Sequence, residues 1–542
     1  MTKQNILQKD YTLNQGYYQF KLPLNIDCMI PADDSVRLLS QFVEEMDLSD
    51  LYSTYFRIRK NQATPRQMLK IVLYAAMNRV YSCRNIRTAC QRDINYMFLL
   101  EGMPVPDHAT IARFKTLHLA ECSEKLLAEM SELLYEIGEI SGETIFIDGT
   151  KIESCANKYT FVWKKAVTKN LAKLLDKLAE FVELCEIQYG LKIAYKNQVT
   201  LHQVKKLRKK LYKLKKEEGI VFVHGAGKRK TQLQKSIEQL EEYCEKLKEY
   251  TQKIYKCGDR NSYSKTDPDA TFMRMKEDAM KNGQLKPAYN LQHGVDSEYI
   301  VWLTIGPQPT DTTTLIPFIK GMEEALSFKY EKVTADAGYE SEENYLFLEG
   351  NQQIAFIKPS NYEISKTRKY KNDISKRENM EYHAEEDFYI CKNGKKLVVS
   401  GAKTDKSKTG YKSEKTIYTC EDCSECPYKR DCIKGNNCKT PLEERTKNLQ
   451  VSKVFQQKRK EDLERIISDE GCQLRMNRSI QAEGSFAGIK SDLGIRRFLC
   501  RGKRNVLAES IIAAMAHNMN KLHHKIQAGR TGTHLYELKK SA

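Results

Sequence analysis

The sequence predicts an α/β protein whose mixed central sheet is flanked and interrupted by helical regions. Short, β-branched apolar runs recur between residues 144 and 358, in the order strand, insertion, strand, strand, helix, strand, helix, strand. Stretches with apolar residues at spacings of three and four precede and interrupt these runs. The chain has 542 residues, a length that accommodates about two to four domains.

The chain is strongly basic. Lysine and arginine number 89 against 71 aspartates and glutamates, a formal net charge of +18. Such a charge attracts polyanions, of which nucleic acid is the commonest, although membrane-surface and ribosome-associated proteins are also basic. The sequence has no run of about 18 apolar residues and no signal-peptide core near its start. We therefore expect a cytoplasmic protein without a membrane partner.

Residues 30–135 have helical periodicity. An apolar stripe with helical spacing leads up to residue 46. A second helix is expected to begin at Thr64, because Thr caps helices, Pro65 suits the first turn and Gln67 occupies the capping-box position. A later helix is expected to begin at Asp107.

Three arginines mark one of these N-terminal helices. Arg84, Arg87 and Arg92 follow the helix that begins near Thr64 after a short break at Ser82. This pattern predicts either a helix-turn-helix with a basic second helix or a helical bundle whose arginines face solvent. The periodicity alone does not decide between the two.

The sheet is expected to begin with residues 144–152, a strand that presents Asp148 at its end. A second strand with a terminal aspartate covers residues 332–336 and ends at Asp336. The remaining expected elements are strands at 288–295, 299–305 and 354–358 and helices at 313–325 and 342–348.

Long charged helices are expected between residues 164 and 255. Apolar residues recur there with alternating spacings of three and four, which predicts a helical hairpin or a small coiled-coil bundle. Residues 205–216 include eight lysines and arginines. Such a run is usually a solvated face, and it is also suited to contacts with DNA phosphates.

A third carboxylate, Glu483, lies in a predicted helix over residues 474–490. Lys490 follows seven residues later, so both side chains project from nearly the same face. Gly484 and Gly488 each cost about 1 kcal/mol in a helix relative to alanine, which indicates a close backbone approach there. Two strand-end aspartates and a helix glutamate form a set that suits two Mg²⁺ ions roughly 3.5–4 Å apart. Two further aspartates, Asp267 and Asp269 in the segment SKTDPDA, are typical turn and cap residues.

The 16 cysteines fall into two groups. Ten are scattered, including Cys28, Cys90 and Cys244, and are typical of small buried apolar side chains. Six lie between Cys391 and Cys438, with C-x-x-C spacing at Cys420, Cys423 and Cys426. This spacing predicts a structural Zn²⁺ site. The alternatives are an iron–sulfur cluster and unliganded or redox-active thiols. The four ligands expected are Cys391, Cys423, Cys426 and Cys432, with Cys420 as a substitute.

Several motifs together resemble the DDE transposases of bacterial insertion sequences. They are FIDGTKIE at residues 146–153, NKYTFVWKK at 157–165, SKTDPDATFMRMKED at 264–278, VTADAGY at 333–339 and QAEGSFAGIK at 481–490, followed by RRFLCRG at 496–502. The resemblance extends from about Pro31 to about Lys525. It is strongest to the branch with a helical N-terminal domain and a long helical insertion after the first aspartate. It implies an RNase H-like catalytic core.

The resemblance implies that Asp148, Asp336 and Glu483 are the catalytic carboxylates and hold Mg²⁺ or Mn²⁺. Related branches carry Tyr-x-x-Arg-x-x-x-Glu-x-x-x-x-x-x-Lys around the glutamate. Here Met476 stands at the tyrosine position and Ser479 at the arginine position, with Arg478 one residue away. How the DNA end is handled, including any hairpin intermediate, therefore stays open. The phosphate- and DNA-binding residues expected are Arg475, Arg478, Lys490, Arg497, Arg84 and Arg87.

The function implied is binding of insertion-sequence ends, followed by metal-dependent cleavage and strand transfer into target DNA. The expected partners are double-stranded DNA and a second copy of the chain, at the nucleoid. The alternatives are an RNase H-like DNA-binding protein without catalysis and a metal-dependent nuclease without strand transfer. The expected domains are a DNA-binding region at 1–135, core segments at 140–163, 258–360 and 451–525, a helical insertion at 164–257, a Cys-rich insertion at 361–450 and a tail at 526–542.

Overall fold

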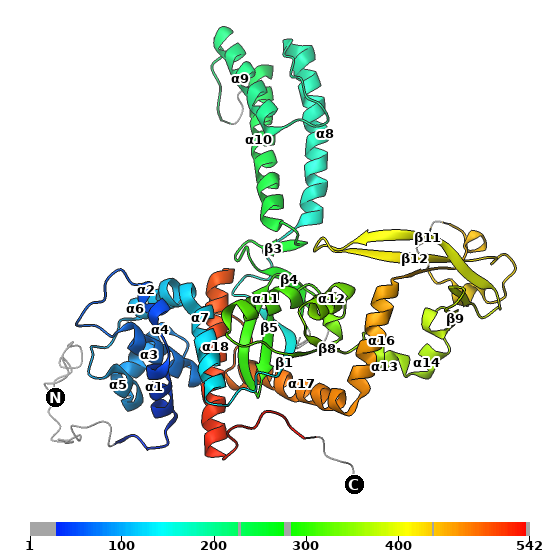
Figure 1. Cartoon of the computed structure of the whole chain (residues 1–542). Helices are drawn as coiled ribbons and strands as arrows, with labels where there is room; N and C mark the ends of the chain where they lie inside the picture. Colours follow the sequence, from blue (N-terminus) through cyan, green and yellow to red (C-terminus); the bar gives the residue numbers. More distant parts are fainter. Residues whose placement is uncertain (1–28, 226–228, 276–282, 436–437, 439, 538–542) are drawn as a thin grey trace, which may run out of the picture.

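The computed structural model describes residues 29–225, 229–275, 283–435, 438 and 440–537. A central sheet lies between a group of N-terminal helices and the later helices α16 and α17, and three long helices project from this body as an arm (Figure 1). A mixed α/β sheet with many helices was the predicted class, and the structure confirms it.

The N-terminal helices form as their sequence pattern predicts. Thr64 accepts a hydrogen bond from the backbone N–H of Gln67, and the Gln67 side chain accepts one from the backbone N–H of Thr64, which completes the capping box. Asp107 caps the helix that follows it. The apolar side chains of the first helix are buried. The bounds are α1 Ser35–Glu45, α2 Ser49–Ser53, α3 Pro65–Met77, α4 Cys83–Arg92, α5 Ile94–Leu100, α6 His108–Arg113, the π-helical η3 Phe114–Leu119 and α7 Ala120–Glu136.

The central sheet has six strands in the order β4-β5-β1-β7-β8, with β6 paired to β5 beyond the end of β4. The strands β1, β7 and β8 are parallel to one another, whereas β5 is antiparallel to both β1 and β6. The turn between β5 and β6 has positive φ angles at Ser297 and Glu298. The bounds are β1 Thr144–Glu153, β4 Thr271–Arg274, β5 Leu285–Asp296, β6 Tyr299–Gly306, β7 Lys332–Ala335 and β8 Ile354–Ile357.

The first strand does not end at Asp148, which corrects the expectation from the sequence. Strand β1 continues to Glu153 because its antiparallel partner β5 pairs with it as far as Glu153↔Ala288. Only the parallel pairing with β7 stops before the aspartate, at Ile147↔Ala335. Asp148 is therefore still paired with β5 on one side of the strand, whereas the pairing with β7 on the other side has already ended.

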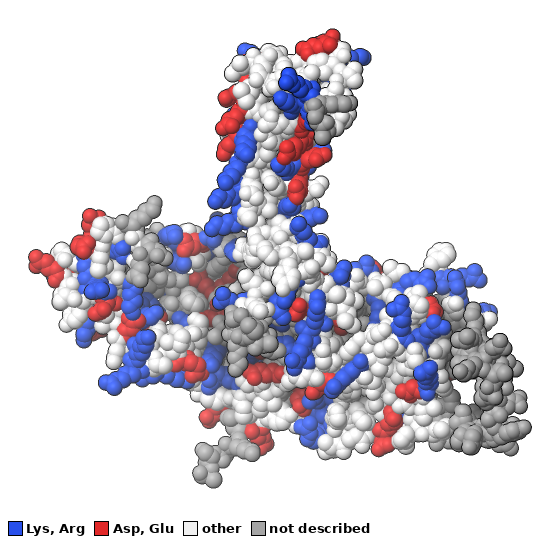
Figure 2. All heavy atoms as spheres, turned by 180° about the vertical axis from the view of Figure 1, so that it is seen from behind, with Lys and Arg blue, Asp and Glu red and all other residues white. Residues whose placement is uncertain are grey.

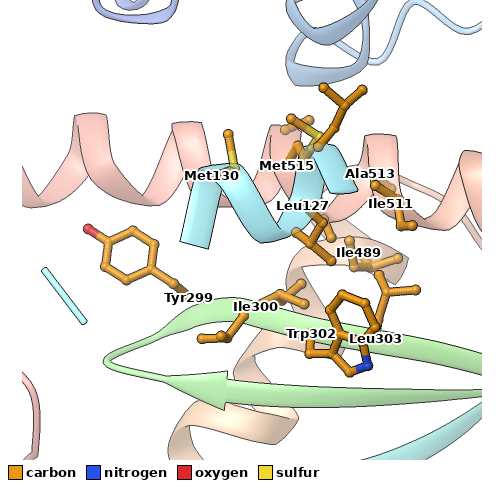
Figure 3. Packing of buried hydrophobic residues seen from close by; sticks show 14 of the residues in the cluster. Leu127, Met130, Tyr299, Ile300, Trp302, Leu303, Ile489, Ile511, Ala513 and Met515 are labelled. Atoms are coloured by element: carbon orange, nitrogen blue, oxygen red, sulfur yellow. The ribbon is translucent and has the colours of Figure 1, made fainter. Parts of the chain in front are cut away.

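The helices that follow the strands close the core around the sheet. Helix α17 packs against β1, β5 and β7, and α18 packs against β6, α3 and α7. The N-terminal helices, the sheet and α18 consequently share one hydrophobic core, part of which is drawn in Figure 3. The bounds are α11 Leu315–Ala325, the 3₁₀ turn η4 Ala337–Tyr339, α12 Glu342–Gly350, α16 Lys453–Ile467, α17 Asp469–Ala487, the π-helical η7 Gly488–Asp492 and α18 Lys503–Gln527.

The expected long helices form the arm, which has an apolar core of its own. Helix α10 packs against both α8 and α9. The arm leaves the body between the paired strands β2 and β3, which hold its two ends together. Within the described residues, no helix is long and apolar enough to cross a membrane. The bounds are β2 Phe161–Trp163, α8 Lys164–Tyr189, α9 Leu201–Glu217, α10 Gln232–Cys257 and β3 Ser262–Ser264.

The Cys-rich insertion forms a second sheet with the order β13-β12-β11-β10-β9 and a small core of its own. Its long β11–β12 hairpin reaches back to α12, where Thr409 and Tyr411 donate hydrogen bonds to Glu343 and Glu342. The bounds are α13 Tyr362–Ser365, α14 Arg368–Lys371, η5 Arg377–Asn379, β9 Glu381–His383, β10 Phe388–Ile390, β11 Lys396–Lys406, β12 Lys412–Cys420, α15 Lys429–Cys432, η6 Leu442–Glu444 and β13 Asn448–Val451.

Candidate active site

Asp148 and Asp336 lie on neighbouring strands at the same level of the sheet. Each is the residue after the last parallel pair, which joins Ile147 to Ala335. Side chains at equivalent positions of adjacent parallel strands lie close together. The sheet topology therefore places two carboxylates side by side, as the two strand-associated aspartates predicted.

Close packing around Asp148 requires a glycine after it. A Cβ atom at Gly149 would collide with the side chains of Gln292 and Asp311. Asp336 is held differently, because its Oδ1 accepts a hydrogen bond of 2.8 Å from the backbone N–H of Gly338 and so caps η4. A backbone N–H therefore helps to position each aspartate, that of Gly149 for Asp148 and that of Gly338 for Asp336.

The third carboxylate arrives on α17, and one guanidinium joins all three. Nη2 of Arg478 lies 2.7 Å from Oδ2 of Asp148 and 3.8 Å from Oδ2 of Asp336, and its Nη1 lies 4.0 Å from Oε1 of Glu483. Glu483 is the most exposed of the three carboxylates, with 66% of its side chain accessible. The structure thus brings the three predicted residues around one point.

The donor chemistry of this cluster fits Mg²⁺ or Mn²⁺, since three carboxylates supply the hard oxygen ligands that these ions take. In this structure, however, the carboxylate oxygens face the guanidinium of Arg478 and are not spaced as the ligands of a metal ion. Among the described residues, no group of three or more His, Cys, Asp or Glu side chains is placed to hold a metal ion.

Two buried histidines support the helix segment that carries Glu483. Nδ1 of His293 lies 3.0 Å from Oγ of Ser485, and the ring of His293 stacks on Phe486. Burial lowers the pKa of His293 to about 3 and that of His517 to about 4. A Cβ atom at Gly488 would collide with the ring of His517, which explains this glycine. Gly484 has no such neighbour, so the close approach predicted for it is wrong.

Asp311 is a fourth carboxylate beside the site, and it was not among the residues predicted from the sequence. Its Oδ1 accepts hydrogen bonds from Asn290 at 2.6 Å and Gln292 at 2.9 Å. Its Oδ2 would lie 3.4 Å from a Cβ atom at Gly338, next to Asp336. The available signal was an aspartate in the polar run just before the predicted helix at 313–325.

Two cavities flank the carboxylates. One, of about 240 Å³, begins at Gly149 and includes four basic residues along its wall. The other, of about 300 Å³, lies on the far side of Asp336. The basic residues of the first are Lys151, Lys286, Lys490 and Arg496, and those of the second are Lys358, Arg475 and Arg478.

The other residues predicted to contact DNA are dispersed. Arg475 stacks on the ring of Tyr362 beside the second cavity. Arg497 donates hydrogen bonds to the carbonyl oxygens of Ser154 and Ala156, so part of its guanidinium anchors the segment after β1. Arg84 and Arg87 lie on α4 among the N-terminal helices, where Arg87 is paired with Asp107 at 3.0 Å.

Asp267 and Asp269 are structural, as expected. Asp267 is fully buried and accepts hydrogen bonds from Ser154, Tyr289 and the backbone N–H of Gly502. Asp269 accepts one from the backbone N–H of Lys503, the first residue of α18. Both aspartates therefore fasten the start of α18 to the sheet.

Three cysteines of the Cys-rich insertion lie close enough to a fourth, Cys432, to affect its pKa. Burial raises the pKa of Cys432, and the neighbouring thiols of Cys391, Cys423 and Cys426 raise it further. Burial also raises the pKa of Cys420, to about 12. In the described part of the insertion these sulfurs are not placed as a metal site. The scattered Cys90 and Cys244 are buried as expected, and Cys28 lies outside the described residues.

Two models of known protein families match the chain, one in its N-terminal part and one in its C-terminal part. A family model described as "Transposase DDE domain" matches residues 390–523, which contain strands β11, β12 and β13 of the Cys-rich sheet, Glu483 and most of α18. A second, described as "Transposase domain (DUF772)", matches residues 24–117 in the N-terminal helices. No curated protein matches the chain.

The mixed sheet with three converging carboxylates fits an RNase H-like core of the DDE type. The two family matches support a DDE transposase of the insertion-sequence type, which confirms the resemblance found in the sequence motifs.

Proposed function

We propose that this transposase binds the ends of an insertion sequence, cleaves them in a reaction that depends on Mg²⁺ or Mn²⁺, and joins them to target DNA. One observation carries the proposal: Asp148, Asp336 and Glu483 come from three distant parts of the chain and surround a single guanidinium. Surface carboxylates would not need to converge in this way.

The three carboxylates would hold the divalent cations. When bound, these ions lower the pKa of a water and stabilise the leaving 3′-oxygen. Lys490 and Arg496 line the adjacent cavity and are suited to contact phosphate oxygens, which positions the DNA without reading its sequence. In the joining step, the freed 3′-hydroxyl forms a bond to a target phosphorus while the target 3′-oxygen leaves.

The test uses Asp148→Asn, Asp336→Asn and Glu483→Gln in the full chain, which remove charge with little change of shape. Each variant should lose Mg²⁺-dependent nicking of duplex DNA taken from the flanks of the gene, and should still bind that DNA. Glu464→Gln is the control, since Glu464 is an exposed carboxylate on α16 outside the cluster and its loss should leave cleavage unchanged. Normal cleavage by any of the three variants would contradict the proposal.

The products distinguish the two alternatives. Precut ends incubated with a target plasmid should yield joined DNA. Cleavage without joining would favour a nuclease, and DNA binding without either reaction would favour an inactive binding protein. We place recognition of the DNA ends at α4, with phosphate support from the lysines of α9, and we expect two copies of the chain to act together on DNA at the nucleoid.

We further propose that the Cys-rich insertion binds one structural Zn²⁺ through Cys391, Cys423, Cys426 and Cys432, with Cys420 as a substitute. The spacing of the cysteines supports this set, as does the proximity of Cys391, Cys423 and Cys426 to Cys432, whose pKa they raise. Thiolates in tetrahedral arrangement are the usual ligands of structural zinc.

Elemental analysis of protein purified without chelator should find about one zinc per chain. Cys426→Ser should lose it. Cys438→Ser is the control, because Cys438 is exposed and lies outside the set. Protein without zinc, or equal zinc in both variants, would refute the site. Iron in place of zinc would indicate the iron–sulfur alternative.

A further inference from the structure

Arg478 occupies the centre of the carboxylate cluster. Its guanidinium contacts residues on β1, after β7 and on α17 within 4.0 Å. Only 15% of its side chain is accessible, as for Asp148. Three carboxylates at such distances repel one another, and a cation among them offsets this repulsion.

The fit of the arginine is incomplete. The Nε atom of Arg478 is buried, and among the described residues no group accepts a hydrogen bond from it. A buried donor without an acceptor carries a desolvation penalty. The guanidinium is thus held by its charge while part of its hydrogen-bonding capacity is unused, so the arrangement is open to competition from another cation.

A second position for this side chain adjoins the first. The cavity of about 300 Å³ beyond Asp336 is lined by Arg478 itself together with Lys358, Arg475 and Ser479. Three basic side chains around one cavity suit a phosphate group. A guanidinium that left the carboxylates would therefore find an anionic partner there when DNA is bound.

We propose that Arg478 is an internal counter-ion that holds Asp148, Asp336 and Glu483 in the metal-free protein and is displaced when a divalent cation binds. This proposal rests on the proposed function of the site. Cation and guanidinium compete for the same oxygens, so Arg478 weakens cation binding in the absence of DNA. A phosphate that draws Arg478 into the cavity removes the competition, and by linkage the cation and DNA strengthen each other's binding.

The experiment measures Mn²⁺ affinity by calorimetry on the full metal-free chain without DNA. Arg478→Gln should bind Mn²⁺ on the order of tenfold more tightly, because one positive charge within about 4 Å of the ligands is removed. Arg465→Gln is the control. It removes one positive charge from the neighbouring helix α16, where Arg465 donates a hydrogen bond to the carbonyl oxygen of Glu461, so its Mn²⁺ affinity should equal that of the unmodified chain.

Affinity that is unchanged or lower in Arg478→Gln would overturn the proposal. Arg478→Lys gives a second test if the glutamine variant does not fold. Its single nitrogen cannot occupy the positions of both Nη1 and Nη2, so the contact with Glu483 or with the two aspartates is weakened. Mn²⁺ should therefore bind more tightly than to the unmodified chain, and equal or weaker binding is again contrary. Failure of Mn²⁺ to bind any form, with the protein folded, would instead overturn the proposed function itself.

Discussion

The two histidines behind Glu483 make the stability of this site sensitive to acid. Their pKa values in the folded protein, about 3 for His293 and about 4 for His517, lie below the ordinary value of 6.5. The unfolded chain therefore takes up protons that the folded chain excludes. Their contribution to stability is complete above about pH 6.5 and falls as the pH decreases toward 4.

We expect the unfolding free energy to decrease by about 2 kcal/mol per histidine between pH 7 and pH 5. The His293→Gln variant should lose the part of this decrease that His293 causes. Thermal unfolding at pH 7 and at pH 5 measures it. His524→Gln on the exposed side of α18 is the control. The buried Asp462, whose pKa burial raises to about 7, acts in the opposite direction but is common to all forms. An unchanged pH dependence in His293→Gln would show that His293 is not the group responsible.

Gly484 and Gly488 offer a matched pair on one helix. Gly488→Ala should destabilise the protein by about 1–3 kcal/mol, because its Cβ would meet the ring of His517. Gly484→Ala should be neutral or stabilise it by up to about 1 kcal/mol, since alanine favours helices and the site is open. Denaturant unfolding of both variants decides it. Equal effects would contradict the close contact at Gly488.

At residue level, the sequence predicted three carboxylates that the structure brings together, but not how they are held. Asp148, Asp336 and Glu483 were predicted from motifs and element ends. Arg478 was predicted as a phosphate ligand, and its contact with all three carboxylates depends on the rotation of α17, which spacing alone does not define. Asp311 was missed because its role arises from side-chain packing with β5.

At the level of elements, the arm should be separable from the sheet. Strands β2 and β3 pair through Trp163↔Ser262, and a small apolar cluster at the base joins both ends of the arm. Replacing residues 178–240 by a short glycine-containing loop keeps this base. We expect the shortened protein to unfold near the same temperature but to bind DNA more weakly, with a smaller dependence on salt.

The lysines of α9 provide a finer test of the same prediction. Lys205, Lys206 and Lys209 are exposed, and basic residues are visible along the arm in Figure 2. Changing all three to alanine should weaken binding to element ends and to random DNA equally. It should also lower the salt slope by about 0.9 for each phosphate that the protein no longer neutralises. An unchanged slope would assign this charge to a solvated face.

The boundaries of helices and strands were predictable where they depend on residues that are adjacent in the sequence. The capping box at Thr64 and the turn before Tyr299 formed where expected. The position of Asp148 inside β1 rather than at its end was not predictable, because the continuation of the strand past Asp148 depends on pairing with β5, a strand more than 100 residues later in the chain. Helical spacing predicted the arm helices, whereas their packing order depends on contacts that spacing does not specify.

For the whole molecule, the N-terminal helices share one hydrophobic core with the sheet and α18, so DNA recognition must be tested in the full chain. Helices α3 and α7 pack on α18, so a fragment of residues 1–135 would expose their apolar faces. We therefore expect Arg84→Ala and Arg87→Ala in the full chain to reduce discrimination between the element end and random DNA by about 1–3 kcal/mol. Arg66→Ala, which removes an arginine paired with Glu44, is the control. Footprints that remain unchanged would remove α4 from this role.

The packing of α18 against α3 also sets the timing of folding during synthesis. The apolar face of α3 is complete after Met77, but its partner begins only at Lys503. At about 5–20 residues per second, the ribosome takes roughly 20–90 s to make the chain between them. During that interval the N-terminal helices lack part of their core, and Glu483 has not yet joined the two aspartates. The cluster of Asp148, Asp336 and Glu483 therefore cannot assemble before translation has passed residue 483, and the apolar face of α3 stays uncovered by α18 until the last part of the chain is made.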